Sequence, residues 1–390
     1  MLIDVGALSC DCTDTVLDVL SKAVSGEDGD GPDIWRPHEN PFVRSLIELF
    51  SSRGMLRIDK VRDELAAWLG GKRHLPQQGF IPPTPKPAGP WLSDSELSLV
   101  RIYLENLPPA SFMAEDWSLL VDYLVSRYMP AAAMQTEAEW LTVRSVFMGK
   151  VQAVLGSHAA DATPELADQI MAALPLTVSA AQEAFAPSRV IQSILEYGRA
   201  RCADNVQAIT EATRHRLKRV IMAHEEQRML GAEPPKHTLQ TTLFDEFATL
   251  NRDWRRIALT EVGENAGQGL IASLKPGSRV QRMEVYKGAC PFCKKINGMV
   301  FTVVDPTAKD KDGVTQVWPG KTNIGRSGAA RKRVGSELIP RTAAELWWVP
   351  AGTVHPHCRG TWHALADAHP DDDPKFATWL EQHFAKTRGF

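Results

Sequence analysis

The sequence of 390 residues lacks an excess of charge of one sign: 44 Lys and Arg stand against 47 Asp and Glu, a formal net charge of −3. Nothing in the whole chain therefore indicates a nucleic-acid-binding protein, and any basic surface must be local. It also lacks an apolar run of the roughly 18 residues that a membrane helix needs. The first residues, MLIDVGALSCDCTD, carry acids where a signal peptide has basic residues, so no export signal is expected.

Cysteine is scarce, with six residues, and they are unevenly placed. This usage does not suit a disulfide scaffold and favours a reducing compartment. Cys202 falls in a helical pattern and is predicted to be a buried small hydrophobe. Cys10 and Cys12 are separated by one residue, which is too close for a usual pair of metal ligands. The other three are Cys290, Cys293 and Cys358.

The patterning predicts a mainly α protein with a small α+β carboxyl-terminal domain. Residues 1–75 form an N-terminal helical region, and 76–90 form a proline-rich linker that can be neither helix nor interior strand. This linker is either a spacer or an arm that lies on a neighbouring subunit. Residues 91–275 are a helical body, and 276–390 are an α+β unit whose segment 309–341 is a long, polar, basic loop.

Two pairs of ligand-type residues stand in the α+β unit. Cys290 and Cys293 form a C-x-x-C pair, and His355 and Cys358 form an H-x-x-C pair with the same spacing. Three thiolates and one imidazole match a closed, tetrahedral, structural zinc site, which would staple the carboxyl-terminal domain. His357 is the substitute ligand if His355 points away. Free buried thiols beside a surface histidine are the alternative.

The basic loop contains eight Lys or Arg against three Asp or Glu between residues 309 and 341. Its cations could neutralise DNA phosphates or meet an acidic face of a protein partner. A solvated surface is the third interpretation. The candidate contact residues are Arg326, Arg331, Lys332, Arg333 and Arg341.

Four motifs in order resemble the phage head-morphogenesis family, the minor capsid proteins typified by protein F of phage Mu. They are a helix with an I-A-x-T-E core at 257–261, the C-x-x-C pair, the Asn297-Gly298 turn with Phe301, and the H-P-x-C-R sequence at 355–359. The resemblance covers about residues 190–363. This chain departs from the family's pattern in its long basic insertion and in the ELWWVP sequence before His355.

The resemblance implies a minor capsid protein that acts in head assembly near the portal. It implies the portal protein and the major capsid protein as partners, with packaged DNA as a possible contact of the basic loop. It further implies a virion location, reached through the bacterial host cytoplasm during assembly. We expect no membrane, no small-molecule substrate and no catalytic residue.

Two enzyme classes remain as alternatives. A zinc-stapled nuclease or toxin-like enzyme would use His357 or His363 as a base, but Asp367 is the nearest acid, and Glu345 and Glu337 lie upstream. The Glu-Ala-Glu sequence at 137–139 is similar to the paired glutamates of ADP-ribosyl transferases, although a solvated helix face explains it better. A DNA-binding adaptor is the non-enzymatic alternative.

Overall fold

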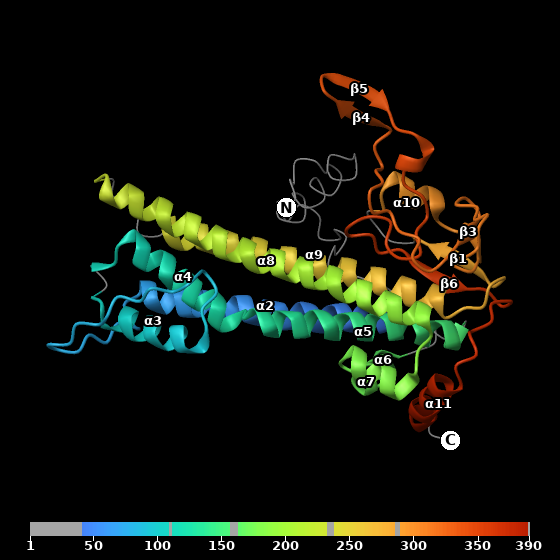
Figure 1. Cartoon of the computed structure of the whole chain (residues 1–390), viewed down its shortest axis with the longest axis horizontal. Helices are drawn as coiled ribbons and strands as arrows, with labels where there is room; N and C mark the ends of the chain where they lie inside the picture. The colour runs from blue at the N-terminus through green and yellow to red at the C-terminus, as the bar shows by residue number, and fades with distance from the viewer. Residues whose placement is uncertain (1–40, 109–110, 157–162, 232–237, 285–288, 389–390) are drawn as a thin grey trace, which may run out of the picture. The chain divides into compact units, whose positions relative to one another are not determined.

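The computed structural model describes residues 41–108, 111–156, 163–231, 238–284 and 289–388 (Figure 1). Cys10, Cys12 and most of the predicted N-terminal region 1–75 lie outside the described residues. The described chain is mainly helical with a small sheet region near its carboxyl end, which confirms the predicted fold class at this level. None of the described helices is long and apolar enough to cross a membrane.

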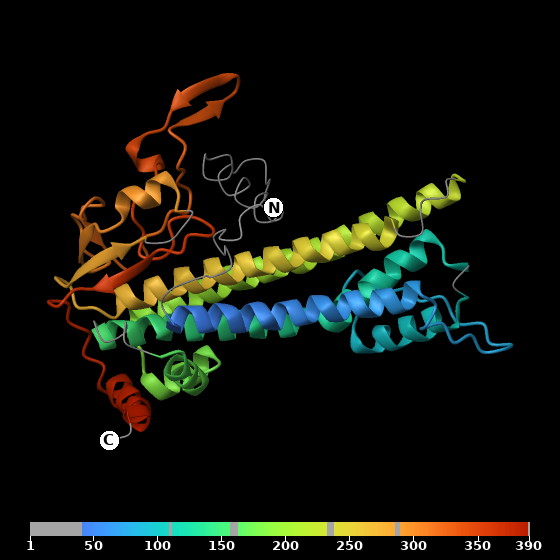
Figure 2. The same ribbon diagram turned by 180° about the vertical axis from the view of Figure 1, so that it is seen from behind.

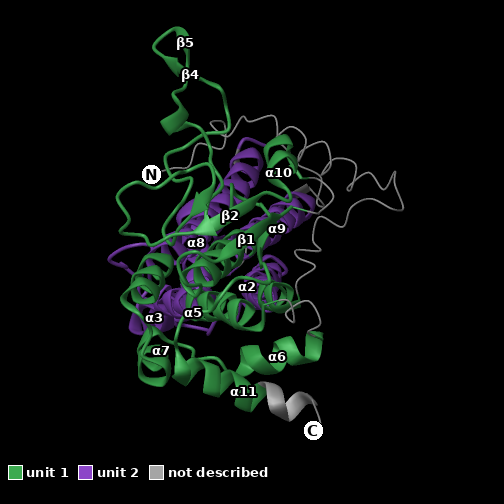
Figure 3. Ribbon diagram, turned by 90° about the vertical axis from the view of Figure 1, so that its right-hand side faces the viewer, with its two compact units in different colours: residues 1–48, 140–199, 259–390 green, residues 49–139, 200–258 purple. Residues whose placement is uncertain are grey.

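Four long helices account for most of the helical residues in the described chain: α2 (Pro41–Leu69), α5 (Ala131–Leu155), α8 (Arg189–Met229) and α9 (Thr238–Ala272). The chain divides into two compact units (Figure 3). Unit 1 comprises residues 1–48, 140–199 and 259–390, and unit 2 comprises 49–139 and 200–258. Each long helix has residues in both units, so the unit boundaries fall inside helices and not at the positions where the composition changes.

Unit 2 also contains α3 (Asp94–Asn106) and α4 (Ala114–Tyr128). Ser93 caps α3 in a capping box with Glu96, as the sequence SDSE predicts. In its core, the Trp254 and Phe50 rings stack with centroids 5.3 Å apart. A Cβ atom on Gly54 would lie 1.6 Å from Trp254 Nε1, so only glycine leaves room for this indole.

The proline-rich segment 76–90 has no helix and no strand, as predicted. Just before it, the Leu75 backbone N–H donates to the Glu105 carbonyl at 2.6 Å. Near its end, the Ala88 N–H donates to the Glu96 carboxylate at 3.1 Å. The segment therefore runs beside α3 from the end of that helix to its start.

Glu137 does not lie on a solvated face, contrary to the interpretation of the Glu-Ala-Glu sequence. Its carboxylate is buried and accepts from the guanidinium groups of Arg53 at 2.6 Å and Arg57 at 3.0 Å. The error arose because helical spacing alone does not show that two arginines of α2 reach the same carboxylate. Both arginines hold Glu137 in a structural ion pair.

In unit 1, α6 (Pro164–Ala173) and α7 (Val178–Phe185) pack with the carboxyl-terminal α11 (Pro374–Arg388). Phe185 of α7 contacts Phe376 of α11 edge to face, with ring centroids 5.1 Å apart. The buried Lys150 ammonium pairs with Asp371 at 3.1 Å and Asp373 at 2.8 Å. The chain thus ends in a short helix, and Lys150 ties the segment before this helix to α5.

A four-stranded sheet of order β3-β2-β1-β6 forms the centre of the carboxyl-terminal part. Its strands are β1 (Arg279–Met283), β2 (Val300–Val303), β3 (Gln316–Val317) and β6 (Thr361–Ala364). β1 pairs antiparallel with β2 and β6, and β2 pairs parallel with β3. Val280, Phe301 and Trp362 share the buried face because side chains alternate along each strand.

The basic segment is not a continuous loop. It contains β3 and a separate antiparallel hairpin of β4 (Arg331–Val334) and β5 (Glu337–Pro340). Both views show this hairpin apart from the four-stranded sheet (Figures 1 and 2). A 3-10 turn, η4 (Ala343–Glu345), follows it. The prediction of a long loop is wrong here because the Gly335-Ser336 pair between two short strand-forming runs makes a hairpin turn.

Candidate metal centre

The first ligand pair sits at the start of α10 (Pro291–Ile296). Cys290 is the N-cap residue, with extended backbone angles, and its sulfur accepts from the Cys293 N–H at 3.5 Å. Pro291 occupies the first turn, where its missing N–H costs no hydrogen bond. A helix start turns the chain within three residues, so both thiols point to the same side of α10.

The second pair sits in the tight turn before β6. The Cys358 N–H donates to the His355 carbonyl at 3.0 Å, and His357 between them has a φ of 68°. This left-handed backbone conformation is unusual for residues other than glycine. The His357 N–H donates to Thr260 Oγ1 of α9 at 3.2 Å, which helps to hold this conformation. The turn directs His355 and Cys358 to the same point.

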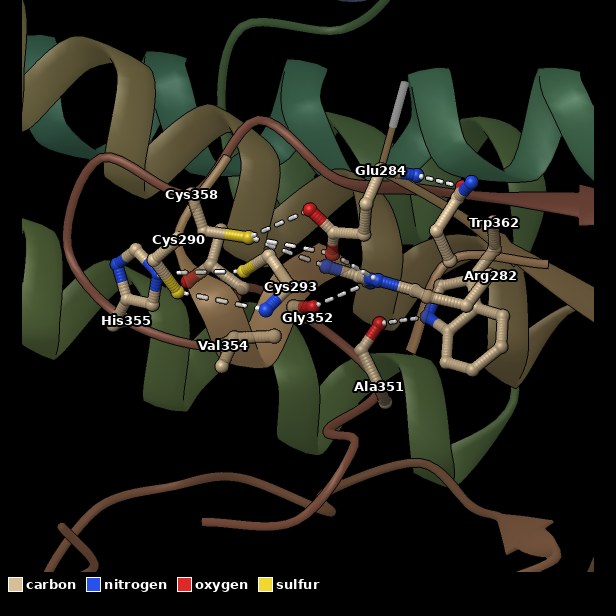
Figure 4. Close-up of polar contacts among 12 residues, drawn as sticks. Arg282, Glu284, Cys290, Cys293, Ala351, Gly352, Val354, His355, Cys358 and Trp362 are labelled. Atoms are coloured by element: carbon tan, nitrogen blue, oxygen red, sulfur yellow. Dashed lines mark hydrogen bonds and ion pairs between the residues drawn. The ribbon is translucent and has the colours of Figure 1, made fainter. Parts of the chain in front are cut away.

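The four side chains lie close together and could hold a metal ion (Figure 4). His355 Nε2 lies 3.4 Å from both Cys290 Sγ and Cys293 Sγ. Cys293 Sγ belongs to a second group with Cys358 Sγ and a Glu284 oxygen, within 4.8 Å of one another. In a tetrahedral zinc site with ordinary bond lengths, nitrogen and sulfur ligands stand about 3.5 Å apart. The distances on His355 match that value.

The tautomer of His355 suits a metal ligand. Its Nδ1–H donates to the Pro356 carbonyl at 2.7 Å, so Nε2 is the ring nitrogen that faces the thiols. Such a bond on the outer nitrogen fixes the ring orientation of a ligating histidine. His357 belongs to neither group of ligand-type side chains found among the described residues. His355, not its substitute, is therefore the histidine of the cluster.

The thiols favour a mixed protonation state. A hydrogen bond from the Cys293 thiol, together with His355, lowers the pKa of Cys290 to about 4. Burial opposes ionisation of Cys358, but the Cys293 thiol and the Arg282 charge hold its pKa well below the usual value. Burial lowers the pKa of His355, yet its hydrogen bond to Cys290 raises it to about 9. A bound dication would displace the protons held on Cys293 and His355.

Arg282 and Glu284 are site residues that the sequence did not indicate. Arg282 is fully buried on the inner face of β1, and its Nε donates to Glu284 at 2.8 Å. Its other nitrogens donate to the Gly352 carbonyl at 3.0 Å and to Cys358 Sγ at 3.4 Å (Figure 4). Burial lowers the pKa of Arg282, but the charges of Glu284 and Cys358 more than offset this effect and raise it. Arg282 stands two residues after the apolar Val280, and this spacing, which puts both side chains on the same face of a strand, was its one sequence signal for burial.

Helix α9 holds the segment that leads to His355. The buried Glu264 carboxylate accepts from Thr353 N–H at 2.7 Å and from its hydroxyl at 3.0 Å. Gly267 allows the backbone of Ala351 to approach, since a Cβ there would lie 2.5 Å from the Ala351 carbonyl oxygen. Residues 351–355, here called the ligand loop, thus rest directly on the α9 backbone, and the hydrogen bonds to the Glu264 carboxylate fix them there.

Aromatic rings cover the outer side of the cluster. Trp347 stacks on the His355 imidazole with centroids 5.2 Å apart, and Phe292 meets Trp347 edge to face at 5.7 Å. Trp348 instead faces Lys321 and the Arg326 guanidinium, which lies 3.6 Å from its ring centroid. Of the two tryptophans in the ELWWVP sequence, Trp347 is therefore the one that packs against the ligand His355. These rings shield sulfur and imidazole from water.

Apart from His357, which lies in the turn between His355 and Cys358, the residues proposed for a nuclease are not gathered at the cluster. His363 is exposed on β6, on the face opposite Trp362. Asp367 pairs with Arg279 at 2.5 Å, and Glu345 pairs with Lys332. Glu337 is exposed on β5. Among the described residues, Glu284 is the acid grouped with the thiols, and it is paired with Arg282 at 2.8 Å.

The five candidate contact cations have different environments. Arg326 lies over Trp348 and donates to the Leu346 carbonyl at 2.8 Å. Lys332 pairs with Glu345. Arg341 is half-buried, and its backbone N–H bonds the Ala330 carbonyl at 2.9 Å. Arg331 and Arg333 are exposed on β4. Within the described part of the chain, no ion pair is found for the Arg331 and Arg333 side chains.

Comparisons of the chain with models of protein families, with curated proteins and with solved structures found no match.

Proposed function

We propose that this chain is a minor capsid protein of a bacteriophage head, which acts in head assembly near the portal and has a structural role. The observation that carries the proposal is that residues of the four motifs lie around one cluster. Thr260 holds the His357 backbone at 3.2 Å, and Asn297 Oδ1 accepts from Glu284 N–H at 2.8 Å. Phe301 packs on Trp362 with centroids 5.4 Å apart. Motifs far apart in the sequence thus serve one centre.

In this proposal a single zinc ion is held by Cys290, Cys293, His355 and Cys358. Three soft thiolates and an imidazole favour zinc over the hard cations that oxygen ligands select. Four protein ligands fill a tetrahedral site, so the ion would fasten the ligand loop to α10 and would leave no position for an activated water. The role is therefore structural.

The proposed partners are the portal protein and the major capsid protein, with the virion head as the location. The portal protein, the major capsid protein and the packaged DNA come together in the head, and the basic β4–β5 hairpin supplies a contact for a charged surface of one of them. Its cations are concentrated in one segment of a chain whose net charge is only −3. A local charge of this kind favours one oriented contact over general adhesion.

Particle analysis tests the proposal. In cells that produce phage particles from a genome carrying this coding sequence, gradient-purified heads or proheads should contain the chain in few copies relative to the major capsid protein. Cys293→Ala should reduce its incorporation. The matched control is Cys202→Ala, because Cys202 is equally buried but lies in α8, outside the cluster. A chain that never sediments with heads, proheads or portal complexes contradicts the proposal.

An activity assay separates the proposal from the nuclease alternative. The purified chain, incubated with duplex or single-stranded DNA and magnesium or manganese, should produce no cleavage. Cleavage that is lost in His357→Ala would replace the structural proposal by the enzymatic one.

A further inference from the structure

The β4–β5 hairpin is a short ribbon with a tight turn. Its register pairs Arg331 with Pro340, Arg333 with Leu338, and Val334 with Glu337. Gly335 and Ser336 form the two-residue turn, and the φ of 62° at Gly335 fits a turn that needs glycine in its first central position. This turn twists the two strands in the direction that paired strands prefer. The ribbon is therefore a regular element and not an irregular excursion.

The two faces of the ribbon differ. Residues directly opposite each other share a face, so Lys332 and Ile339 lie on one face, and Arg331 and Arg333 lie on the other. Lys332 and Ile339 are the half-buried residues of the two strands, and Lys332 pairs with Glu345 of η4. One face is thus anchored, and the face with the two arginines is directed to solvent.

The arginine face carries uncompensated charge. Arg331 and Arg333 are exposed, and no ion pair to a carboxylate is found for either within the described part of the chain. The residues opposite them, Leu338 and Pro340, are exposed and uncharged. The face thus combines two positive groups with an apolar strip and no acid.

The dimensions of this face match duplex DNA. Alternate residues of a strand stand about 6.6 Å apart, which is about two base-pair steps along a duplex. The major groove of B-DNA admits a two-stranded ribbon. The strands carry no aromatic ring on which an unpaired base could stack, which argues against single-stranded nucleic acid.

Pairing with a partner's strand fits the ribbon less well. Lys and Arg side chains along β4 and a proline at the end of β5 are features that protect a sheet edge from further pairing.

We propose that the β4–β5 ribbon binds the backbone of duplex DNA through Arg331 and Arg333. This proposal adds a partner to the proposed function but does not rest on it, because the isolated chain should bind DNA.

The test measures anisotropy of a fluorescent duplex of about 25 base pairs against the full-length protein over a range of salt concentrations. Each neutralised phosphate contributes about 0.9 to the slope of log K against log salt. Arg331→Gln with Arg333→Gln should therefore lower the magnitude of the slope by about 1.8 and weaken binding at low salt. The melting temperature should remain unchanged because both side chains are exposed.

Two further variants control for charge. Lys60→Gln with Lys72→Gln removes the same charge from exposed positions outside the hairpin and should leave the slope unchanged. Arg331→Lys with Arg333→Lys keeps the charge and should keep the slope. The proposal is overturned if the wild-type chain does not bind the duplex at low salt, or if the hairpin and control variants have the same slope. Polyglutamate serves as a model of an acidic protein. The proposal is also overturned if polyglutamate binds as tightly as DNA, and if the Arg331→Gln, Arg333→Gln variant loses affinity for polyglutamate but not for DNA.

Discussion

Lys321 shows how a single buried cation is held by backbone carbonyl groups and aromatic rings. Its side chain is 1% exposed, and its ammonium donates to the Gly313 carbonyl at 2.9 Å and the Gln316 carbonyl at 2.7 Å. The Trp318 and Trp348 rings lie 4.8 and 4.9 Å from the nitrogen. Burial nevertheless lowers its pKa from 10.5 to about 7. By contrast, Arg282 retains its charge because Glu284 lies beside it.

This lowered pKa predicts a specific dependence of stability on pH. The folded state binds the Lys321 proton more weakly than the unfolded state does. The contribution of Lys321 to the free energy of unfolding is therefore greatest above pH 10.5 and falls as the pH is lowered towards 7. Between about pH 9.5 and pH 7.5 the loss should be on the order of 2 kcal/mol.

Thermal unfolding of the wild type and of Lys321→Met at pH 9.5 and pH 7.5 measures this loss of stability. The wild-type melting temperature should fall more than that of the variant as the pH is lowered, and other titrating groups cancel in the difference. Parallel shifts in the two proteins would show that Lys321 does not titrate in this range.

At the scale of elements, α5 and α9 pack in unit 1 with backbones in close approach. A Cβ on Gly149 would lie 2.0 Å from the Ala266 carbonyl oxygen, and one on Gly269 would lie 2.1 Å from the Val146 carbonyl oxygen. Glycine inside a helix costs about 1 kcal/mol relative to alanine. These two glycines are therefore explained by the closeness of the helices and not by helix propensity.

Gly269→Ala should destabilise the protein by about 2 kcal/mol, because backbone atoms must separate, and this outweighs the gain in helix propensity. Gly263→Ala is the matched control in the same helix. There a Cβ would lie 2.9 Å from the Thr353 methyl group, and the nearest backbone atom, the Cys358 carbonyl oxygen, lies 3.9 Å away at an ordinary contact distance. Chemical denaturation measures both free energies of unfolding. An equal or greater loss in Gly263→Ala would contradict the account of the α5–α9 contact.

The predictability of each element follows from how local its determinants are. The capping box at Ser93 and the C-x-x-C turn involve residues three apart, so the sequence indicated both. The β4–β5 hairpin had a signal in Gly335-Ser336, but the basic composition of the segment obscured it. The burial of Arg282 depends on Glu284 and Gly352, and only the folded chain shows where a distant carbonyl such as that of Gly352 lies.

At the scale of the whole molecule, the predicted carboxyl-terminal domain 276–390 is only part of a compact unit. Unit 1 also takes residues from α5, α8 and α9. Glu264 of α9 holds the ligand loop, and Lys150 of α5 holds the segment before α11. Composition changes near residue 275 because strands begin there, whereas compactness depends on contacts with helices much earlier in the chain.

In the proposed function, Cys290, Cys293, His355 and Cys358 bind one metal ion, and this ion stabilises unit 1. The most direct measurement is the zinc content of freshly purified protein by elemental analysis, compared among the wild type, Cys293→Ala and the control Cys202→Ala. We predict about one zinc per chain in the wild type and in Cys202→Ala, and none in Cys293→Ala. A folded wild-type protein without zinc or another bound transition metal, or equal metal content in Cys293→Ala, would contradict the account.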